Sequence, residues 1–107
     1  NRLGKAMVNM ERACTFDDPI NFYEFAKYAI REAMCLPQGK AGLALTLEDV
    51  KKSLEQKILP AEIGAVISEI YTTAKQVEKN EDMEIDLKSK LEIYYEVIRR
   101  LNNAYEK

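Results

Sequence analysis

The chain has 107 residues and a formal net charge of −2, and 47% of its residues are hydrophobic while 32% are charged. These proportions are typical of one globular domain and exclude a disordered chain, and the acidic balance disfavours nucleic acid and anionic membranes as partners. No apolar run approaches the roughly 18 residues of a membrane-spanning helix, which excludes a span within this segment.

The first predicted helix runs from about Leu3 to Cys14. Its apolar side chains return every three or four residues, which predicts one buried stripe along the helix. The stretch "TFDDP" then interrupts the pattern, because Asp18 favours a helix N-cap and Pro19 favours the first helical position. A turn is therefore expected before a second helix.

The second predicted helix runs from Pro19 to about Met34 and is rich in aromatic residues. Tyr23 and Tyr28 each carry a hydroxyl that needs water or a hydrogen-bond partner, so we expect both at an edge or a contact surface. The apolar face of the helix is expected in the core. It consists of Phe22, Phe25, Ala26, Ala29, Ile30, Ala33 and Leu36.

A third helix is predicted after the loop "LPQGKAGLAL", because Thr46 and Asp49 have the spacing of a capping box. Its apolar residues fall on one face, which predicts packing against the remainder of the domain. That stripe consists of Leu47, Val50, Leu54 and Ile58.

The fourth predicted helix begins at Pro60 and has a buried face with a period of 3.6 residues. Gly64 within it costs about 1 kcal/mol relative to alanine, so we expect it to mark a close helix crossing. The apolar face consists of Ile63, Val66, Ile67, Ile70, Ala74 and Val77.

An acidic linker, 80–85, separates this core, 1–79, from a last helix that runs from Asp86 to Tyr105. The last helix has a heptad seam, which Ile93 and Val97 widen. The seam can pack on the same domain, on a second copy, or on a helix of a parent protein. It consists of Leu87, Leu91, Tyr94, Ile98, Leu101 and Tyr105.

The sequence therefore predicts an all-α fold with about five helices in an irregular helical-hairpin array or bundle, spanning 1–107 as a single domain. The chain starts at Asn1 rather than at a methionine. We therefore expect it to be a fragment, either trimmed or processed, of a larger protein.

The absence of histidine excludes Ser-His-Asp and Cys-His nucleophile systems and every zinc site that needs imidazole. Two cysteines cannot form a four-thiolate zinc site, and both lie near predicted helix C-termini, where a thiolate is not stabilised. Cys14 and Cys35 are expected to be buried free thiols, although a bridge between them is the alternative.

Three short motifs fail the tests of the sites that they suggest. The stretch "NEDMEID" lacks the glycine and the final glutamate of a calcium loop, and "GKAG" lacks the remaining residues of a phosphate-binding loop. The third and fourth helices have the short joint of a DNA-binding pair, but the fourth opens with Glu62 and no base-reading side chain. We therefore expect no enzyme activity, no cofactor, no metal and no nucleic acid partner.

Two stretches, "NFYEFAKYAIREAM" and "LTLEDVKKSLEQKILPAEIGAVISEIYTTAKQ", together resemble the C-terminal helical domain of the BatD-like bacterial aerotolerance (oxygen tolerance) family. A Phe-Tyr pair opens an alanine-rich helix, and a Leu-Thr cap, a short helix, a joint and a longer helix follow. The matching positions are Phe22, Tyr23, Ala29, Leu45, Thr46, Val50, Leu54, Ile63, Ile67, Ile70, Ala74 and Lys75.

This resemblance implies a membrane-anchored parent with extracytoplasmic β-sandwich domains, one transmembrane helix and a cytosolic helical domain on the inner membrane. It also implies von Willebrand factor A-domain Bat proteins and MoxR-type AAA+ ATPases as partners. It carries over no catalytic residue.

We therefore expect a non-catalytic protein-interaction module, juxtamembrane in its parent. The alternative is a structural domain that forms a homodimer through the last helix. Tyrosine suits surfaces that are wet at one end, which makes five tyrosines candidates for partner contact, although they can instead complete the core. The candidates are Tyr23, Tyr28, Tyr94, Tyr95 and Tyr105.

Overall fold

The computed structural model describes residues 1–36, 46–80 and 82–106, and within them it contains five α-helices and no strand. The predicted all-α fold is therefore confirmed. The helices are α1 (Arg2–Thr15), α2 (Pro19–Ala33), α3 (Leu47–Leu54), α4 (Ala61–Lys79) and α5 (Leu87–Tyr105).

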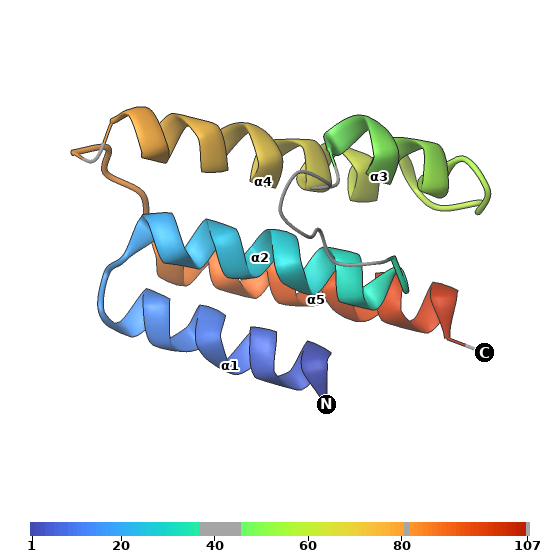
Figure 1. Ribbon diagram of the computed structural model, residues 1–107, viewed down its shortest axis with the longest axis horizontal. Helices are drawn as coiled ribbons and strands as arrows, with labels where there is room; N and C mark the ends of the chain where they lie inside the picture. Colours follow the sequence, from blue (N-terminus) through green and yellow to red (C-terminus); the bar gives the residue numbers. More distant parts are fainter. Residues whose placement is uncertain (37–45, 81, 107) are drawn as a thin grey trace.

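The helices form three layers, with α2 and α5 in the middle (Figure 1). The short helix α3 packs on α4, and these two cover one side of the middle layer, while α1 covers the other side. Helix α2 contacts α1, α4 and α5, so it is the central element of the bundle. Among the described helices, α1 makes extensive contacts only with α2 and α5. Its remaining surface therefore faces outward.

Side-chain caps mark where four of the described helices begin, and at α1 the Asn1 side chain accepts a hydrogen bond from the Gly4 backbone N–H. The Asp18 carboxylate accepts a hydrogen bond from the backbone N–H of Asn21 at 3.2 Å, and Asp86 caps α5 in the same way. Thr46 and Asp49 form the complete capping box of α3. These bonds satisfy N–H groups that have no partner inside the helix, and they confirm the predicted caps at Asp18 and Thr46.

Helices α1 and α2 both end in a left-handed residue that is not glycine. Asp17 has φ of 51° and Cys35 has φ of 57°. After α1, the N–H groups of Asp17 and Asp18 donate to the carbonyls of Cys14 and Ala13, at 3.1 and 2.8 Å. This is the Schellman arrangement, which satisfies the last carbonyls of the helix and reverses the chain. It places α1 and α2 side by side in opposite directions.

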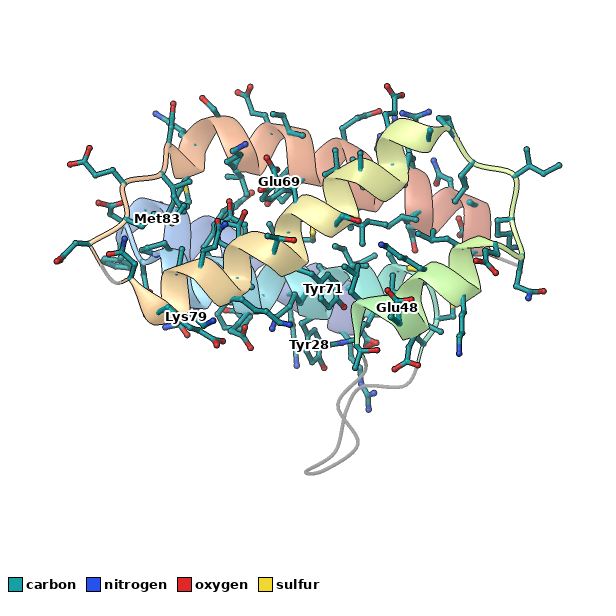
Figure 2. All side chains as sticks on the ribbon, turned by 90° about the horizontal axis from the view of Figure 1, so that it is seen from above. Tyr28, Glu48, Glu69, Tyr71, Lys79 and Met83 are labelled. Atoms are coloured by element: carbon teal, nitrogen blue, oxygen red, sulfur yellow. The ribbon has the colours of Figure 1, made fainter. Side chains whose placement is uncertain are left out.

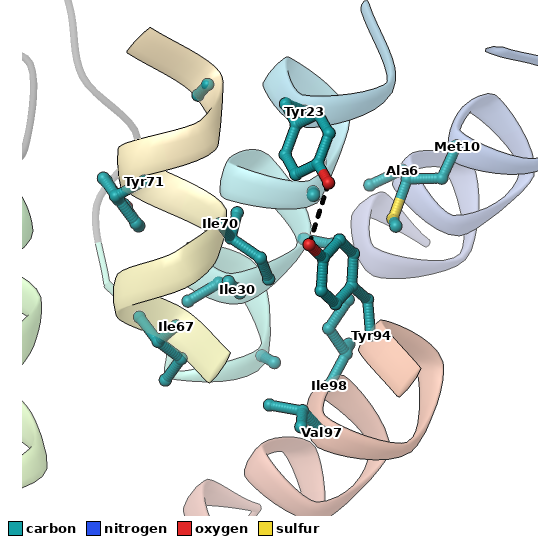
Figure 3. Packing of buried hydrophobic residues seen from close by; sticks show 14 of the residues in the cluster. Ala6, Met10, Tyr23, Ile30, Ile67, Ile70, Tyr71, Tyr94, Val97 and Ile98 are labelled. Atoms are coloured by element: carbon teal, nitrogen blue, oxygen red, sulfur yellow. Dashed lines mark hydrogen bonds between the residues drawn. The ribbon is translucent and has the colours of Figure 1, made fainter. Parts of the chain in front are cut away.

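The core lies between the three layers, and among the described residues its buried side chains are hydrophobic ones and tyrosines. The close-up in Figure 3 shows side chains from α1, α2, α4 and α5 meeting around two tyrosines, Tyr23 and Tyr94. Ala6 and Ala13 of α1 are buried, and small side chains allow α1 to approach its neighbours closely.

The seam of α5 packs on its own domain, because five of its residues belong to the same apolar cluster as the other helices. The core therefore extends beyond residues 1–79. A homodimer through the last helix stays a prediction. The five residues are Leu87, Tyr94, Val97, Ile98 and Leu101.

Three expectations about single residues are wrong. Ile58 is fully exposed, because α3 ends at Leu54 and the stripe does not continue into the joint before α4. Ile93 does not widen the buried seam, since 47% of it is exposed. Gly64 does not mark a close crossing, because a Cβ atom built there meets nothing within 4 Å.

Candidate interaction surface

Two of the five candidate tyrosines, Tyr23 and Tyr94, lie in the core with no exposed surface. Their hydroxyls are 2.9 Å apart, shown by the dashed line in Figure 3. The Tyr94 hydroxyl donates to a Glu69 carboxylate oxygen at 2.7 Å, and the Lys90 ammonium donates to the other oxygen at 2.7 Å. Because the Tyr94 proton points at Glu69, Tyr23 donates to Tyr94.

The resulting row, Tyr23–Tyr94–Glu69–Lys90, runs from the core to the surface and joins α2, α5 and α4. We name it the inner row. Figure 2 shows Glu69 on the side of α4 that faces α5. The expectation that Tyr23 and Tyr94 contact a partner is wrong, because their rings are fully buried and their hydroxyls are bonded to each other.

The electrostatics of the inner row keep its tyrosines neutral and its glutamate charged. Burial, and after it the hydrogen bonds with Tyr23 and Glu69, raises the pKa of Tyr94 far above its ordinary value. Partial burial alone raises the pKa of Glu69, but the hydrogen bonds from Lys90 and Tyr94 outweigh it and leave that pKa lowered. The row is therefore a satisfied polar network that holds three helices together.

Tyr95 and Tyr105 are partly buried, and each ties α5 to another helix. The Tyr95 hydroxyl donates to the Glu11 carboxylate and lies 3.3 Å from the Met7 carbonyl oxygen, both on α1. The Tyr105 hydroxyl donates to the Ser53 carbonyl oxygen on α3 at 3.1 Å. Both hydroxyls therefore have partners within the fold, and a role in partner contact stays a prediction for these two residues.

Tyr28 lies on the opposite side of the molecule from Glu69 (Figure 2). Its partly buried ring and that of Phe25 line one wall of a hollow of about 200 Å³ between α1 and α2. The other wall belongs to α1. It is formed by Arg2, Lys5, Ala6 and Asn9.

A second, wider hollow of about 550 Å³ continues along α1 and shares Lys5 and Asn9 with the first. Val8 lies within it and is 47% exposed. We name the combined lining of the two hollows the outer face. It consists of Asn1, Arg2, Gly4, Lys5, Ala6, Val8, Asn9, Arg12, Phe25 and Tyr28.

The described residues that line the outer face carry positive charge and include no carboxylate. Within the residues that the structure describes, Arg2, Lys5 and Arg12 form no ion pair. Glu11 is the acidic residue of α1, and its carboxylate is held by Tyr95 on the side toward α5. The cations of the outer face are therefore left to interact with solvent or with a ligand.

A third hollow, of about 610 Å³, lies at the far end of the bundle beside the α4–α5 linker. Asp17, Asp82, Glu84 and Asp86 supply its carboxylates. In the described part of the chain, no three acidic or cysteine side chains gather as a metal ion requires. The Asp86 carboxylate, moreover, accepts hydrogen bonds from Ser89 as the cap of α5.

Cys14 is partly buried and Cys35 is exposed, and both are free thiols. The expectation of burial is therefore wrong for Cys35, which lies beyond the end of α2 in a left-handed turn. None of the helices in the ranges given above is both long and apolar enough to cross a membrane.

Sequence reasoning missed two features of the site. Tyr71 is buried, and its spacing from Ile67 and Ala74 on the inner face of α4 could have identified it. The second feature is the group of cations on α1, Arg2, Lys5 and Arg12. Their spacing puts them on the helix face away from the apolar stripe, so the sequence could have predicted them.

No protein-family model matches the chain, and none of the curated proteins or solved structures matches it either. The resemblance to the BatD-like aerotolerance family therefore stays a prediction.

Proposed function

We propose that the chain is a non-catalytic protein-interaction module that receives a helix of a partner protein on the outer face. One observation carries the proposal. The outer face combines partly buried aromatic rings, an exposed valine and cations that form no ion pair with another described residue, on the outward side of an edge helix. Aromatic side chains, arginine and a concave apolar centre are the features that binding surfaces favour.

The position of α1 supports a helical ligand. Because α1 and α2 pack side by side, the groove between them can accept a third helix by the same packing of ridges into grooves. Helix α1 has 14 residues, so it offers a surface about 21 Å long. A partner helix of similar length covers both hollows.

The ionisable groups that the fold brings together also support binding rather than catalysis. Glu69, Lys90, Tyr23 and Tyr94 are satisfied by one another, and the raised pKa of each tyrosine keeps its hydroxyl protonated at neutral pH. A general base needs a group that is poised to accept a proton near the working pH. The groups of the inner row instead hold α2, α4 and α5 together by hydrogen bonds.

The resemblance to the BatD-like family extends the proposal to a location and to candidate partners. On that reading the module lies on the cytoplasmic face of the inner membrane, attached to a membrane-anchored parent. Von Willebrand factor A-domain Bat proteins and MoxR-type ATPases are then the first proteins to test for a helix that binds the outer face.

The test is a selection of helical peptides from a randomised displayed library against the full chain. Two matched variants locate the bound peptides, because Val8 and Ile93 are both apolar, helical and 47% exposed. We expect Val8→Ser to weaken the selected peptides at least about tenfold, whereas Ile93→Ser leaves their affinity unchanged. Peptides that depend on Ile93 and not on Val8, or a selection that enriches none, would contradict the proposal.

A further inference from the structure

We infer that the ligand of the outer face is an acidic amphipathic helix, whose carboxylates pair with Arg2, Lys5 and Arg12 while its apolar side chains cover Val8 and Phe25. The inference rests on the proposed function, because it names the chemistry of the partner at the same surface.

The charge of the outer face differs from that of the whole molecule. The chain has a net charge of −2, yet the described residues that line the outer face include three cationic side chains and no carboxylate. The nearest acidic residue along α1, Glu11, is held by Tyr95 on another side of the helix. A surface of one sign attracts ligands of the opposite sign and orients them.

The spacing of the cations fits a helix better than a compact ligand. Arg2 and Lys5 lie on successive turns of α1, and Arg12 lies two turns further along. The three residues span about 15 Å of the helix axis. A partner helix presents carboxylates over the same length when acidic residues recur along one face, about ten residues from first to last. The guanidinium groups can each bind a carboxylate with two parallel hydrogen bonds.

The apolar part of the surface lies among these cations. Arg2 and Lys5 share a hollow with Phe25 and Tyr28, and Arg12 shares the second hollow with Val8. A purely anionic ligand leaves these apolar side chains exposed, whereas an amphipathic helix covers them. The same apolar side chains disfavour a nucleic acid strand, whose backbone leaves them uncovered.

The test uses two synthetic helical peptides of fifteen residues with the same leucine stripe. One carries glutamate at its polar positions and the other carries lysine. Each is titrated into the isotope-labelled chain at low salt while backbone amide shifts are recorded by NMR. We expect the glutamate peptide to shift the amides of α1 and to bind at least about tenfold more tightly than the lysine peptide.

Charge reversal provides the matched comparison. The double variant Lys5→Glu with Arg12→Glu is expected to lose at least about tenfold in affinity for the glutamate peptide. The control reverses Lys75 and Lys88, two exposed lysines on α4 and α5, and is expected to bind as the parent chain does. Amide spectra of both variants establish that each is folded before binding is compared.

The outcomes separate the inference from the proposed function. Equal binding of the two peptides at the outer face, or tighter binding of the lysine peptide, overturns the acidic ligand and leaves the interaction module standing. Amide shifts away from the outer face for both peptides overturn both. Tighter binding of a fifteen-nucleotide thymidine strand than of the glutamate peptide overturns the inference in favour of nucleic acid.

Discussion

Tyr23 and Tyr28 lie five positions apart on the same helix, yet Tyr23 lies in the core and Tyr28 lines a surface hollow. Tyr23 is fully buried, and its hydroxyl is bonded to Tyr94, whereas Tyr28 is partly buried and lines the hollow beside α1. The difference follows from which neighbour covers each face of α2. Tyrosine content therefore does not identify a binding surface until the partner of each hydroxyl is known.

The charged groups differ between the same two regions. In the inner row, Glu69 receives hydrogen bonds from Lys90 and Tyr94, so its charge is used within the fold. On the outer face, Lys5 and Arg12 have no ion pair within the described residues. The inner row therefore uses its charges within the fold, whereas binding at the outer face is our proposal.

Removal of a whole tyrosine ring is expected to give the largest difference in unfolding free energy between the inner row and the outer face. Tyr94→Ala empties a fully buried site and is expected to lower the free energy of unfolding by about 3–5 kcal/mol. Tyr28→Ala is expected to lower it by less than half as much, because that ring is only partly buried. Urea unfolding of both variants makes the comparison. Equal losses would contradict the assignment of Tyr94 to the core.

Removal of one hydroxyl tests the inner row itself. Tyr94→Phe leaves the Tyr23 hydroxyl without its acceptor and deprives Glu69 of a donor, so we expect a loss of about 1–3 kcal/mol in unfolding free energy. Tyr95→Phe is the matched control, since that hydroxyl is bonded at the more exposed contact between α5 and α1. Its loss is expected to be smaller, about 1 kcal/mol or less. A Tyr94→Phe variant as stable as the parent would show that the hydroxyl contributes nothing.

Acid titration tests the charge of Glu69. Its pKa is lowered in the folded state, so the unfolded state binds the proton more readily and the stabilisation is present above the ordinary glutamate pKa of about 4.3. The stabilisation is lost as the pH falls through the lowered folded pKa. Because 40% of the Glu69 side chain is exposed, we expect this contribution to be about 1 kcal/mol or less.

The measurement compares the unfolding free energy of the parent chain and of Glu69→Gln between neutral pH and pH of about 3. The advantage of the parent is expected to disappear in acid. An advantage that is the same at all pH values would mean that the charge of Glu69 is not involved.

The smallest effect on stability is expected on the outer face. Val8→Ser changes an exposed side chain, so the free energy of unfolding is expected to stay within about 0.5 kcal/mol of the parent. The same variant is expected to bind selected peptides more weakly, as described above. Calorimetric unfolding and peptide titration on one preparation check both statements. A large loss of stability would show that Val8 belongs to the fold rather than to a binding surface.

Local sequence signals predicted the helices well, because caps and periodicity act over a few residues. Asp18, Thr46 and Asp49 fixed two helix starts before any tertiary contact was considered. The same local reasoning failed at Ile58, where the apolar spacing continues but the helix has already ended at Leu54. It also missed the left-handed Cys35, since glycine is the usual residue at that position.

The candidate site was harder to predict because its contacts join distant parts of the chain. The heptad pattern placed Tyr94 on the packed seam, but its hydroxyl partner Tyr23 lies 71 positions away. Because that partner could not be known from the sequence, the need of each hydroxyl for a hydrogen bond predicted a position at the surface for both tyrosines. The outer face likewise depends on how α1 packs beside Phe25, which no spacing within one helix reveals.

Amide shifts that map a selected peptide onto the chain decide most directly whether the outer face binds while the inner row holds the fold. We expect shifts at Lys5, Val8 and Phe25, with the amides around Glu69 and Tyr94 unchanged. Shifts centred on Glu69 and Tyr94, with α1 unaffected, would contradict it.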